Sequence, residues 1–238
     1  MKGLRKSSIQ QIRERFDKDV ERFSNLEAGQ QSTIDAAISL DLITDAAKVI
    51  NPLARILLDI GCGAGNYTLK MLSKIPDLDC TLLDLSMPML DRAKERVSKQ
   101  TNGEIKVIQD DIRQAQIPAG AYDIILAGAV LHHLRDKSDW EFVFRKIYNS
   151  LQQGGSFWIS DLVIQDTLPV NSLIWHQYGN YLEKLGGVDY KKQVSEYIQK
   201  EDSPRSLNFQ LRLMEKVGFK HVEILHKHLC FAAFGGVK

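Results

Sequence analysis

Apolar residues follow two different rhythms through the middle of the chain. Short apolar runs predict buried strands, and polar segments with apolar residues three or four positions apart predict helices between them. The expected strands span 55–60, 79–84, 104–109, 122–127 and 155–161. The expected helices span 65–75, 87–99 and 137–151. This alternation predicts an α/β fold with a doubly wound, mostly parallel sheet.

The two ends of the chain have a different pattern. Apolar positions at helical spacing predict N-terminal helices over 5–24 and 32–50, separated by the turn-like stretch NLEAGQQ. After the last core strand, helical patterns cover 169–185, 190–200 and 205–217, and two strand-like segments follow at 219–226 and 229–236. We expect these two segments to form an antiparallel hairpin at the edge of the sheet.

Composition and charge narrow the class of protein. The 238 residues carry 31 basic and 30 acidic side chains, so the net charge of +1 gives no general attraction to nucleic acid or membranes. No apolar stretch is long enough for a membrane span, and the first ten residues do not resemble a secretory signal, which predicts a cytoplasmic protein. Cys62, Cys80 and Cys230 are widely spaced, which predicts reduced thiols rather than disulfides or a zinc site.

The stretch LLDIGCGAGN, at the end of the first expected strand, carries the strongest chemical signal. Three alternating glycines allow a tight turn and close approach of backbone to a ligand at the carboxyl end of the sheet. Their spacing departs from the GxGxxG of dinucleotide sites, because the last glycine comes one residue early. Asp84 ends the second strand, where its carboxylate is placed to accept hydrogen bonds from a ribose diol.

Four motifs in this order resemble those of the class I S-adenosylmethionine-dependent methyltransferases. They are DIGCGAG, LLDLS, VIQDDIRQ and YDIILAGAVLHHL, and the resemblance covers residues 52–162. It implies a Rossmann-like sheet of seven strands, with S-adenosylmethionine as cofactor and a small molecule as substrate. The cofactor-binding residues that it implies are Asp59, Gly61, Gly63, Gly65, Asp84, Leu85, Asp110, Asp111, Ile112 and Ala127. In that scheme the first acid and glycine loop hold the methionine, Asp84 the ribose, and Asp111 and Ile112 the adenine.

The residues that bind the methyl acceptor are harder to identify from the sequence. His132 opens the HH pair after the fourth strand and is the expected catalytic residue, as a base or an orienting group. The sequence AGAVLHHL lacks the proline-aromatic signature of enzymes that methylate nucleic-acid amino groups, so no nucleic-acid footprint is expected. No metal site is expected either, because His226 and His228 have no acidic or Cys partner at a matching spacing.

The expected organisation is a single methyltransferase domain with added segments. Residues 1–50 form a helical cap, 52–162 the cofactor-binding core, 165–217 a helical insertion or lid, and 218–238 the closing hairpin. We expect the cap and lid to enclose the substrate, with Phe23, Asn25, Gln30, Gln31, Trp175, His176 and Tyr178 as pocket residues.

Alternative functions stay open at this stage, as does the oligomeric state. FDKDV, DIR, KIYNSLQQGG and KVGF also resemble the enzymes that make carboxy-S-adenosylmethionine, although GCGAG stands here in place of their GCSxG. A nicotinamide-dependent oxidoreductase and a non-catalytic nucleotide-binding partner are the remaining alternatives.

Overall fold

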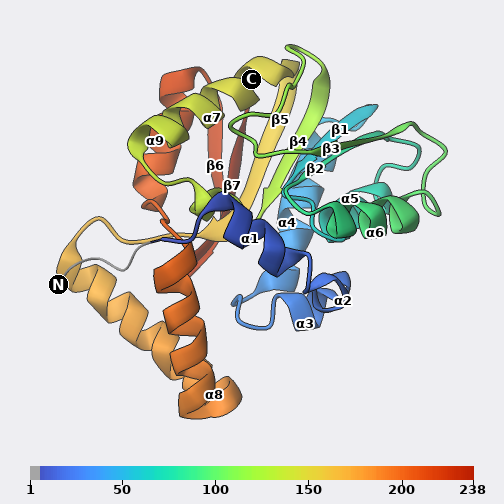
Figure 1. Ribbon diagram of the computed structural model, residues 1–238. Helices are drawn as coiled ribbons and strands as arrows, with labels where there is room; N and C mark the ends of the chain where they lie inside the picture. The colour runs from blue at the N-terminus through green and yellow to red at the C-terminus, as the bar shows by residue number, and fades with distance from the viewer. Residues whose placement is uncertain (1–5) are drawn as a thin grey trace.

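The computed structural model describes residues 6–238, and seven of its strands form one sheet (Figure 1). The strand order is β3-β2-β1-β4-β5-β7-β6. Strands β3, β2, β1, β4 and β5 run parallel, whereas β7 is antiparallel to both β5 and β6. The strands are β1 (Ile56–Ile60), β2 (Asp79–Asp84), β3 (Ile105–Gln109), β4 (Tyr122–Gly128), β5 (Leu151–Leu162), β6 (His221–His228) and β7 (Phe231–Val237). The predicted fold class, with its closing antiparallel hairpin, is confirmed.

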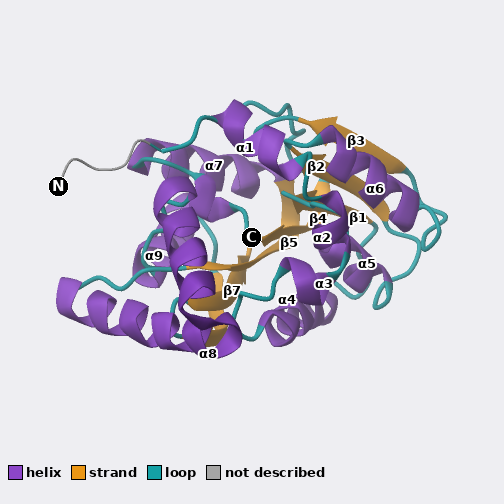
Figure 2. Cartoon of the chain, turned by 60° about the horizontal axis from the view of Figure 1, so that its bottom comes forward, coloured by secondary structure: helices purple, strands orange, loops and turns teal. Residues whose placement is uncertain are grey.

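Helices cover both faces of the sheet (Figure 2). On one face α4 (Ala36–Ile50), α5 (Asn66–Leu72) and α6 (Met87–Val97) pack against alternate side chains of β1, β2 and β4. On the other face α7 (Lys137–Ser150) and α9 (Leu207–Val217) bury Trp140, Phe144 and Met214 against the opposite side chains. Because both faces are covered, the central strands read as continuous apolar runs in the sequence.

Local capping explains where several of these helices begin. The side chains of Ser86, Asp136 and Ser206 accept hydrogen bonds from backbone N–H groups in the first turns of α6, α7 and α9. Each of these side chains satisfies a donor that has no partner within its helix. The capping residues thereby fix the positions at which these three helices begin.

The N-terminal segment differs in detail from the expected pair of helices. The predicted helix 5–24 begins outside the described residues and is divided into α1 (Ile9–Phe16) and α2 (Val20–Ser24). The short α3 (Leu26–Gly29) lies in the predicted turn. Helix α4 begins only at Ala36, because the preceding Asp35 has a left-handed backbone conformation with φ of 55°.

The segment after β5 forms α8 (Leu168–Glu201), which extends away from the sheet in Figure 1. Gly187 interrupts this helical run with φ of 83°, so the predicted helices 169–185 and 190–200 correspond to its two halves. Tyr178 and Leu182 of α8 pack with Leu162 and Phe231 at the ends of β5 and β7. This third apolar cluster fixes the first half of α8 beside the carboxyl ends of the central strands.

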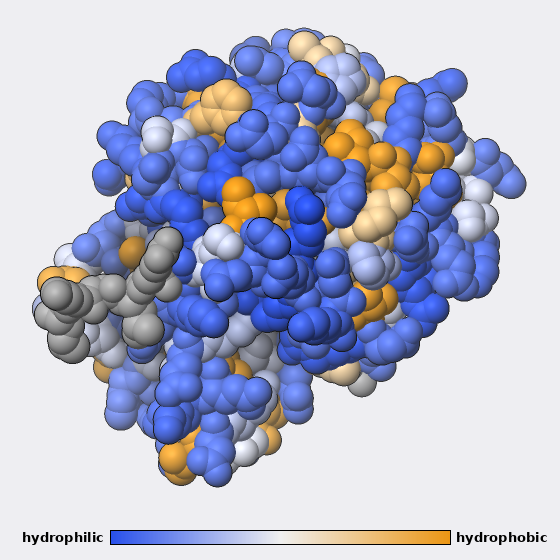
Figure 3. Space-filling model, viewed as in Figure 1, coloured by the Kyte–Doolittle hydropathy of each residue, from blue (hydrophilic) through white to orange (hydrophobic). Residues whose placement is uncertain are grey.

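The face in Figure 3 is mainly hydrophilic, with apolar residues in small separate groups. Among residues 6–238, no helix combines the length and apolar character needed to cross a membrane.

Candidate cofactor and substrate site

A cavity of about 620 Å³ lies at the carboxyl ends of the parallel strands, and we call it the strand-end cavity. Its wall runs from Asp110 after β3, past Asp84 and Gly63, to His132 after β4 and Asp161 in β5. The order of the chain reverses between β1 and β4, which is where doubly wound sheets bind their ligands. The fold therefore places the glycine loop at the middle of the cavity.

The three glycines of this loop serve different purposes. A Cβ added at Gly61 would lie 2.4 Å from Val130 Cγ2, and one at Gly65 would lie 3.2 Å from Ala93 Cβ. A Cβ added at Gly63 would meet no atom of the described residues within 4 Å, because Gly63 lines the open cavity. Packing explains the first and last glycines, whereas the middle one leaves space for a ligand.

Asp84 lies beside this open position. Its carboxylate oxygens accept hydrogen bonds from the backbone N–H groups of Gly63 and Ser86, both at 2.9 Å. Burial raises the pKa of Asp84 above its usual value, and these backbone hydrogen bonds oppose the rise. The carboxylate is thus fixed at the cavity wall with lone pairs still available for ribose hydroxyls.

Asp59 is buried beneath the loop and does not line the cavity. Its Oδ2 accepts hydrogen bonds from the Thr68 backbone N–H at 3.1 Å and hydroxyl at 2.7 Å. Its Oδ1 is buried without a partner among residues 6–238. Burial raises the pKa of Asp59 to about 7 despite the hydrogen bonds from Thr68. The unpartnered oxygen is the kind of acceptor that a cofactor ammonium group would satisfy.

The expected adenine end is formed by the segment after β3. Asp110, Asp111 and Ile112 line the cavity. The Asp111 carboxylate is already bound by the Arg113 guanidinium, with an Nη2–Oδ2 distance of 2.6 Å. Burial would raise the pKa of Asp111, but the hydrogen bonds from Arg113 outweigh it and lower this pKa. Asp111 therefore has only its remaining lone pairs to offer an adenine amino group.

The other expected cofactor residues divide between the cavity wall and the interior. Leu85 lines the cavity, whereas Gly65 and Ala127 do not, and Ala127 is fully buried within β4. The wall beside β4 is formed instead by Gly128, Ala129 and Val130. Ala129 has φ of 52°, a conformation that turns the chain toward η1 (Leu131–His133).

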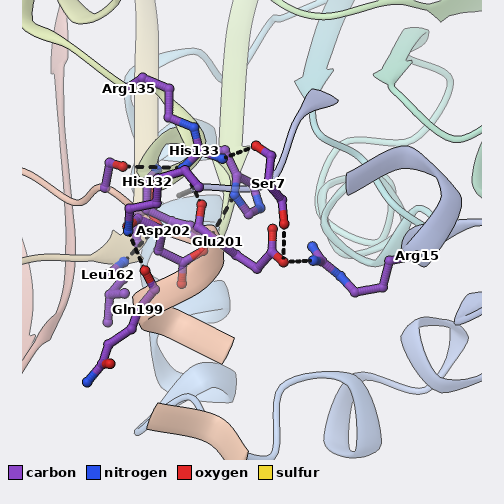
Figure 4. A network of polar contacts seen from close by, with 12 residues as sticks. Ser7, Arg15, His132, His133, Arg135, Leu162, Gln199, Glu201 and Asp202 are labelled. Atoms are coloured by element: carbon purple, nitrogen blue, oxygen red, sulfur yellow. Dashed lines mark hydrogen bonds and ion pairs between the residues drawn. The ribbon is translucent and has the colours of Figure 1, made fainter. Parts of the chain in front are cut away.

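His132 lies in η1 and faces two carboxylates. Its Nδ1 contacts Asp161, and its backbone N–H donates to Oδ2 of the same residue at 3.2 Å. Its Nε2 lies 3.6 Å from Oδ1 of Asp202, and Nδ1 of His133 lies 3.5 Å from the same oxygen. Figure 4 shows these side chains beside the end of α8. His132, His133 and Asp202, which we call the His-His-Asp cluster, all line the cavity.

Charge in this cluster is distributed unevenly. Burial would lower the pKa of His132, but the carboxylates of Asp161 and Asp202 outweigh it and raise this pKa to about 9. Burial lowers the pKa of His133 well below its usual value, and the positive charge of His132 acts in the same direction. Burial raises the pKa of Asp202 to about 6. The cluster therefore concentrates three titratable groups in one low-dielectric corner of the cavity.

A second layer of polar contacts holds Asp202 in place. Glu201 lies between Ser7 and Arg15, with its Oε1 2.8 Å from the Ser7 hydroxyl and 2.8 Å from Arg15 Nη1 (Figure 4). The Ser203 N–H donates to the His132 carbonyl at 2.7 Å. The end of α8 is thereby joined both to α1 and to the histidine segment after β4.

Both flanking segments contribute to the cavity wall. The N-terminal residues on it are Arg15, Phe16, Asp19, Arg22, Phe23, Gly29, Gln30, Ser32 and Thr33. The residues from α8 are Tyr178, Tyr190, Gln193, Val194, Tyr197 and Ile198. Tyr178 also donates its hydroxyl to the Ser32 carbonyl at 2.9 Å, which connects the two segments. The remaining expected pocket residues, Asn25, Gln31, Trp175 and His176, do not line the cavity.

Sequence reasoning missed Asp161 and Asp202. Asp161 had a usable signal, because it is an acid near the carboxyl end of a core strand, as Asp84 is. Asp202 had none, because it reaches the site only after the 34 residues of α8. Sequence reasoning also missed the partner of His226 and His228, since Asp35 Oδ2 lies 2.9 Å and 2.8 Å from their ring nitrogens.

Cys62, the thiol in the glycine loop, is free, as the sequence predicts. Cys62 is buried, and burial together with the nearby Asp84 carboxylate raises the pKa of its thiol well above the usual value. A thiol in that state is a poor nucleophile.

Comparisons with known proteins agree with this site. A family model described as a methyltransferase domain matches residues 57–155. The chain is 28% identical over 187 residues to carboxy-S-adenosyl-L-methionine synthase of Helicobacter pylori (strain Shi470). This alignment covers 76% of the present chain and 74% of the synthase. It is 26% identical over 201 residues to demethylmenaquinone methyltransferase of Listeria monocytogenes serotype 4a (strain HCC23), which covers 81% and 83%.

Among solved structures, human N-acetylserotonin methyltransferase in complex with SAM shares the fold with a TM-score of 0.62 at 15% identity. The superposition covers 97% of the present chain and 57% of the human enzyme's chain. The matched model begins in β1 and includes the glycine loop, Asp84 and the HH pair, so the comparisons and the cavity concern the same residues. The matched methyltransferase domain, these relatives and the shared fold together support a class I S-adenosylmethionine-dependent methyltransferase.

Proposed function

We propose that this methyltransferase transfers the methyl group of S-adenosylmethionine to a small molecule enclosed in the strand-end cavity. The observation that carries the proposal is that residues of α1–α3 and α8 line the cavity together with the ends of β4 and β5. A volume of about 620 Å³ falls within the roughly 300–1,000 Å³ of small-ligand sites. Since cofactor and acceptor share this space, the acceptor is small.

The order of the strands sets the direction of the bound cofactor in this proposal. Asp84 and the segment from Asp110 to Ile112, at the ends of β2 and β3, take the adenosine. The glycine loop takes the methionine portion, and Asp59 lies behind the loop, bonded to Thr68. The methyl group then points toward the ends of β4 and β5, where Phe16, Tyr178 and Tyr197 supply aromatic walls.

His132 is the catalytic residue of this proposal. Asp161 holds its Nδ1, so the ring is fixed at the acceptor end of the cavity with Nε2 on the side of Asp202. An acceptor placed there is oriented for in-line attack on the methyl carbon, and such positioning supplies much of the rate enhancement in methyl transfer.

A fractionation experiment tests the small-molecule acceptor. The protein is incubated with S-adenosylmethionine and either the ultrafiltrate or the retained macromolecules of a cell extract, and S-adenosylhomocysteine is quantified by mass spectrometry. We expect the ultrafiltrate to stimulate product formation, and the Asp84→Ala variant to lose that stimulation. Stimulation by the retained macromolecules alone would refute the proposal.

One observation favours a second function, the formation of carboxy-S-adenosylmethionine. Arg15 reaches the cavity wall, and its Nη2 is buried without a hydrogen-bond partner among residues 6–238. A guanidinium in that position suits the carboxylate of a carboxyl donor. The mass of cofactor that copurifies with the protein separates the two functions, because the carboxylated form is heavier than S-adenosylmethionine.

A further inference from the structure

We propose that the His-His-Asp cluster binds a divalent transition-metal ion at the acceptor end of the strand-end cavity. One ligand atom from each of His132, His133 and Asp202 lies within 4.8 Å of the other two. Two imidazoles and one carboxylate form a donor set suited to zinc, iron or cobalt. The position of the ion relative to the acceptor rests on the proposed function, whereas the binding site itself does not.

The spacing of the three atoms fits metal coordination better than direct hydrogen bonding. The two nitrogen–oxygen distances to Asp202 Oδ1 are 3.6 Å from His132 and 3.5 Å from His133. These are too long for good N–H···O hydrogen bonds. Ligands bound at about 2.0–2.2 Å around a tetrahedral ion lie roughly 3.3–3.6 Å apart. An ion that displaces the Nε2 proton of His132 to solvent therefore fits between the three side chains without a large rearrangement.

Two of the three atoms lack any other partner. His133 Nδ1 and Asp202 Oδ1 are buried and accept or donate no hydrogen bond among residues 6–238. Asp202 is only 5% exposed. Buried polar groups are nearly always paired, because an unpaired one loses its hydration without compensation. A bound ion would supply the missing partner to both atoms at once.

The surroundings of the cluster also match those of metal sites. Asp161 holds the other nitrogen of His132, and a carboxylate on the far side of the imidazole is the usual support for a metal-binding histidine. The Asp161 carboxylate is itself fixed by the Leu162 N–H at 2.7 Å. The contacts of Glu201 and Ser203 hold Asp202 on the opposite side. The three ligands are thus positioned before any ion binds.

Three protein ligands leave a coordination position for a ligand from the cavity. This arrangement favours an acceptor that presents a hydroxyl oxygen. Coordination lowers the pKa of such a hydroxyl, and its proton passes to water. The oxygen then attacks the methyl carbon, the C–S electron pair stays on sulfur, and the products are a methyl ether and S-adenosylhomocysteine.

A second cluster on the surface supplies the competing interpretation of any metal binding. Asp35, His226 and His228 also lie close together. There, however, Asp35 Oδ2 already pairs with both rings, at 2.9 Å and 2.8 Å. Those contacts join the start of α4 to β6, and among residues 6–238 no buried side-chain atom of this cluster lacks a hydrogen-bond partner. Any test must nevertheless separate the two clusters.

The test is a Co²⁺ titration followed by visible absorption, with the His226→Ala/His228→Ala double variant as the starting protein. We expect this variant to bind one Co²⁺ per chain with the absorption bands of a low-coordinate site, and Zn²⁺ to bleach them. Adding Asp202→Asn or His133→Gln should abolish the bands. Adding Asp161→Asn should weaken Co²⁺ binding by about 10–100-fold. His176→Ala, which removes an exposed histidine outside the cavity, is the matched control and should change nothing.

Two results would overturn the proposal. One is the absence of Co²⁺ binding in the double variant, which would assign all binding to the surface cluster. The other is unchanged binding after both Asp202→Asn and His133→Gln. Each variant is also titrated with S-adenosylhomocysteine, which reports correct folding. Absence of Co²⁺ binding in the double variant, with S-adenosylhomocysteine binding retained, contradicts only the metal site, whereas failure of methyl transfer to any ultrafiltrate contradicts the proposed function.

Discussion

Replacing Gly63 by alanine separates the ligand-binding purpose of the loop from its folding. Gly63 has φ of 50°, and a Cβ built there meets no atom of the described residues within 4 Å. The cost to folding is thus mainly the left-handed backbone, about 1–2 kcal/mol for a residue with a Cβ. The lower entropy of the unfolded chain offsets about 0.4–1 kcal/mol of it. We expect Gly63→Ala to lower the melting temperature by only a few degrees, at roughly 2–4 °C per kcal/mol.

The cost to cofactor binding should be larger. The new methyl group would occupy the open space beside Asp84, whose carboxylate accepts the Gly63 N–H. Forcing a methyl group into a filled site typically costs about 1–3 kcal/mol. At about 1.4 kcal/mol per decade, this corresponds to a loss of roughly 5- to 150-fold in affinity.

Gly120→Ala is the matched control. Gly120 has φ of 59°, its added Cβ also meets nothing within 4 Å, and it lies outside the cavity. Calorimetric titration with S-adenosylhomocysteine and thermal unfolding without ligand are measured for both variants. Both should lose similar stability, but only Gly63→Ala should lose affinity. Equal affinities in the two variants would refute the assignment of this space to the cofactor.

Three further predictions concern other parts of the site. Asp84→Ala should weaken S-adenosylhomocysteine binding at least about ten-fold, since charged hydrogen bonds contribute about 1.5–3 kcal/mol each. Asp79→Ala, at the other end of β2, is the control and should leave the affinity measured by calorimetry unchanged. Folded Asp59 keeps its proton up to about pH 7 and the unfolded chain loses it near 3.8, so the folded state binds more protons between these values. The free energy of unfolding should therefore fall as pH rises through this window. Denaturant titrations at several pH values should show that the free energy of unfolding of Asp59→Asn depends less on pH. Hydrogen exchange should show that S-adenosylhomocysteine protects residues 6–50 and 165–200 as well as the glycine loop; protection confined to the loop would contradict an ordered lid.

The core of the fold follows from its sequence pattern because each element is specified locally. The apolar runs at 55–60 and 79–84 have no competing helical period, and the glycines after the first run mark the turn that lines the cavity. The predicted fold class, family and cofactor are confirmed, whereas the roles of individual site residues stay predictions. The division into cap, core, lid and hairpin also stays a prediction.

What the sequence could not supply depends on contacts between distant segments. Asp35 takes a left-handed conformation where it pairs with histidines of β6, which delays the start of α4. Asp202 joins the cavity through contacts of the α8 end with α1, so no local motif marks it. Helical spacing made Trp175 and Tyr178 equal pocket candidates, but only the latter lines the cavity.

A crystal structure with S-adenosylhomocysteine would locate every part of the cofactor at once. We expect one ligand in the strand-end cavity, with its ribose hydroxyls on Asp84 and its sulfur toward His132 and Asp161. The anomalous signal of the ligand sulfur would fix that direction independently. A ligand bound outside the cavity, or one with its adenine against His132 and its sulfur near Asp111, would contradict the account.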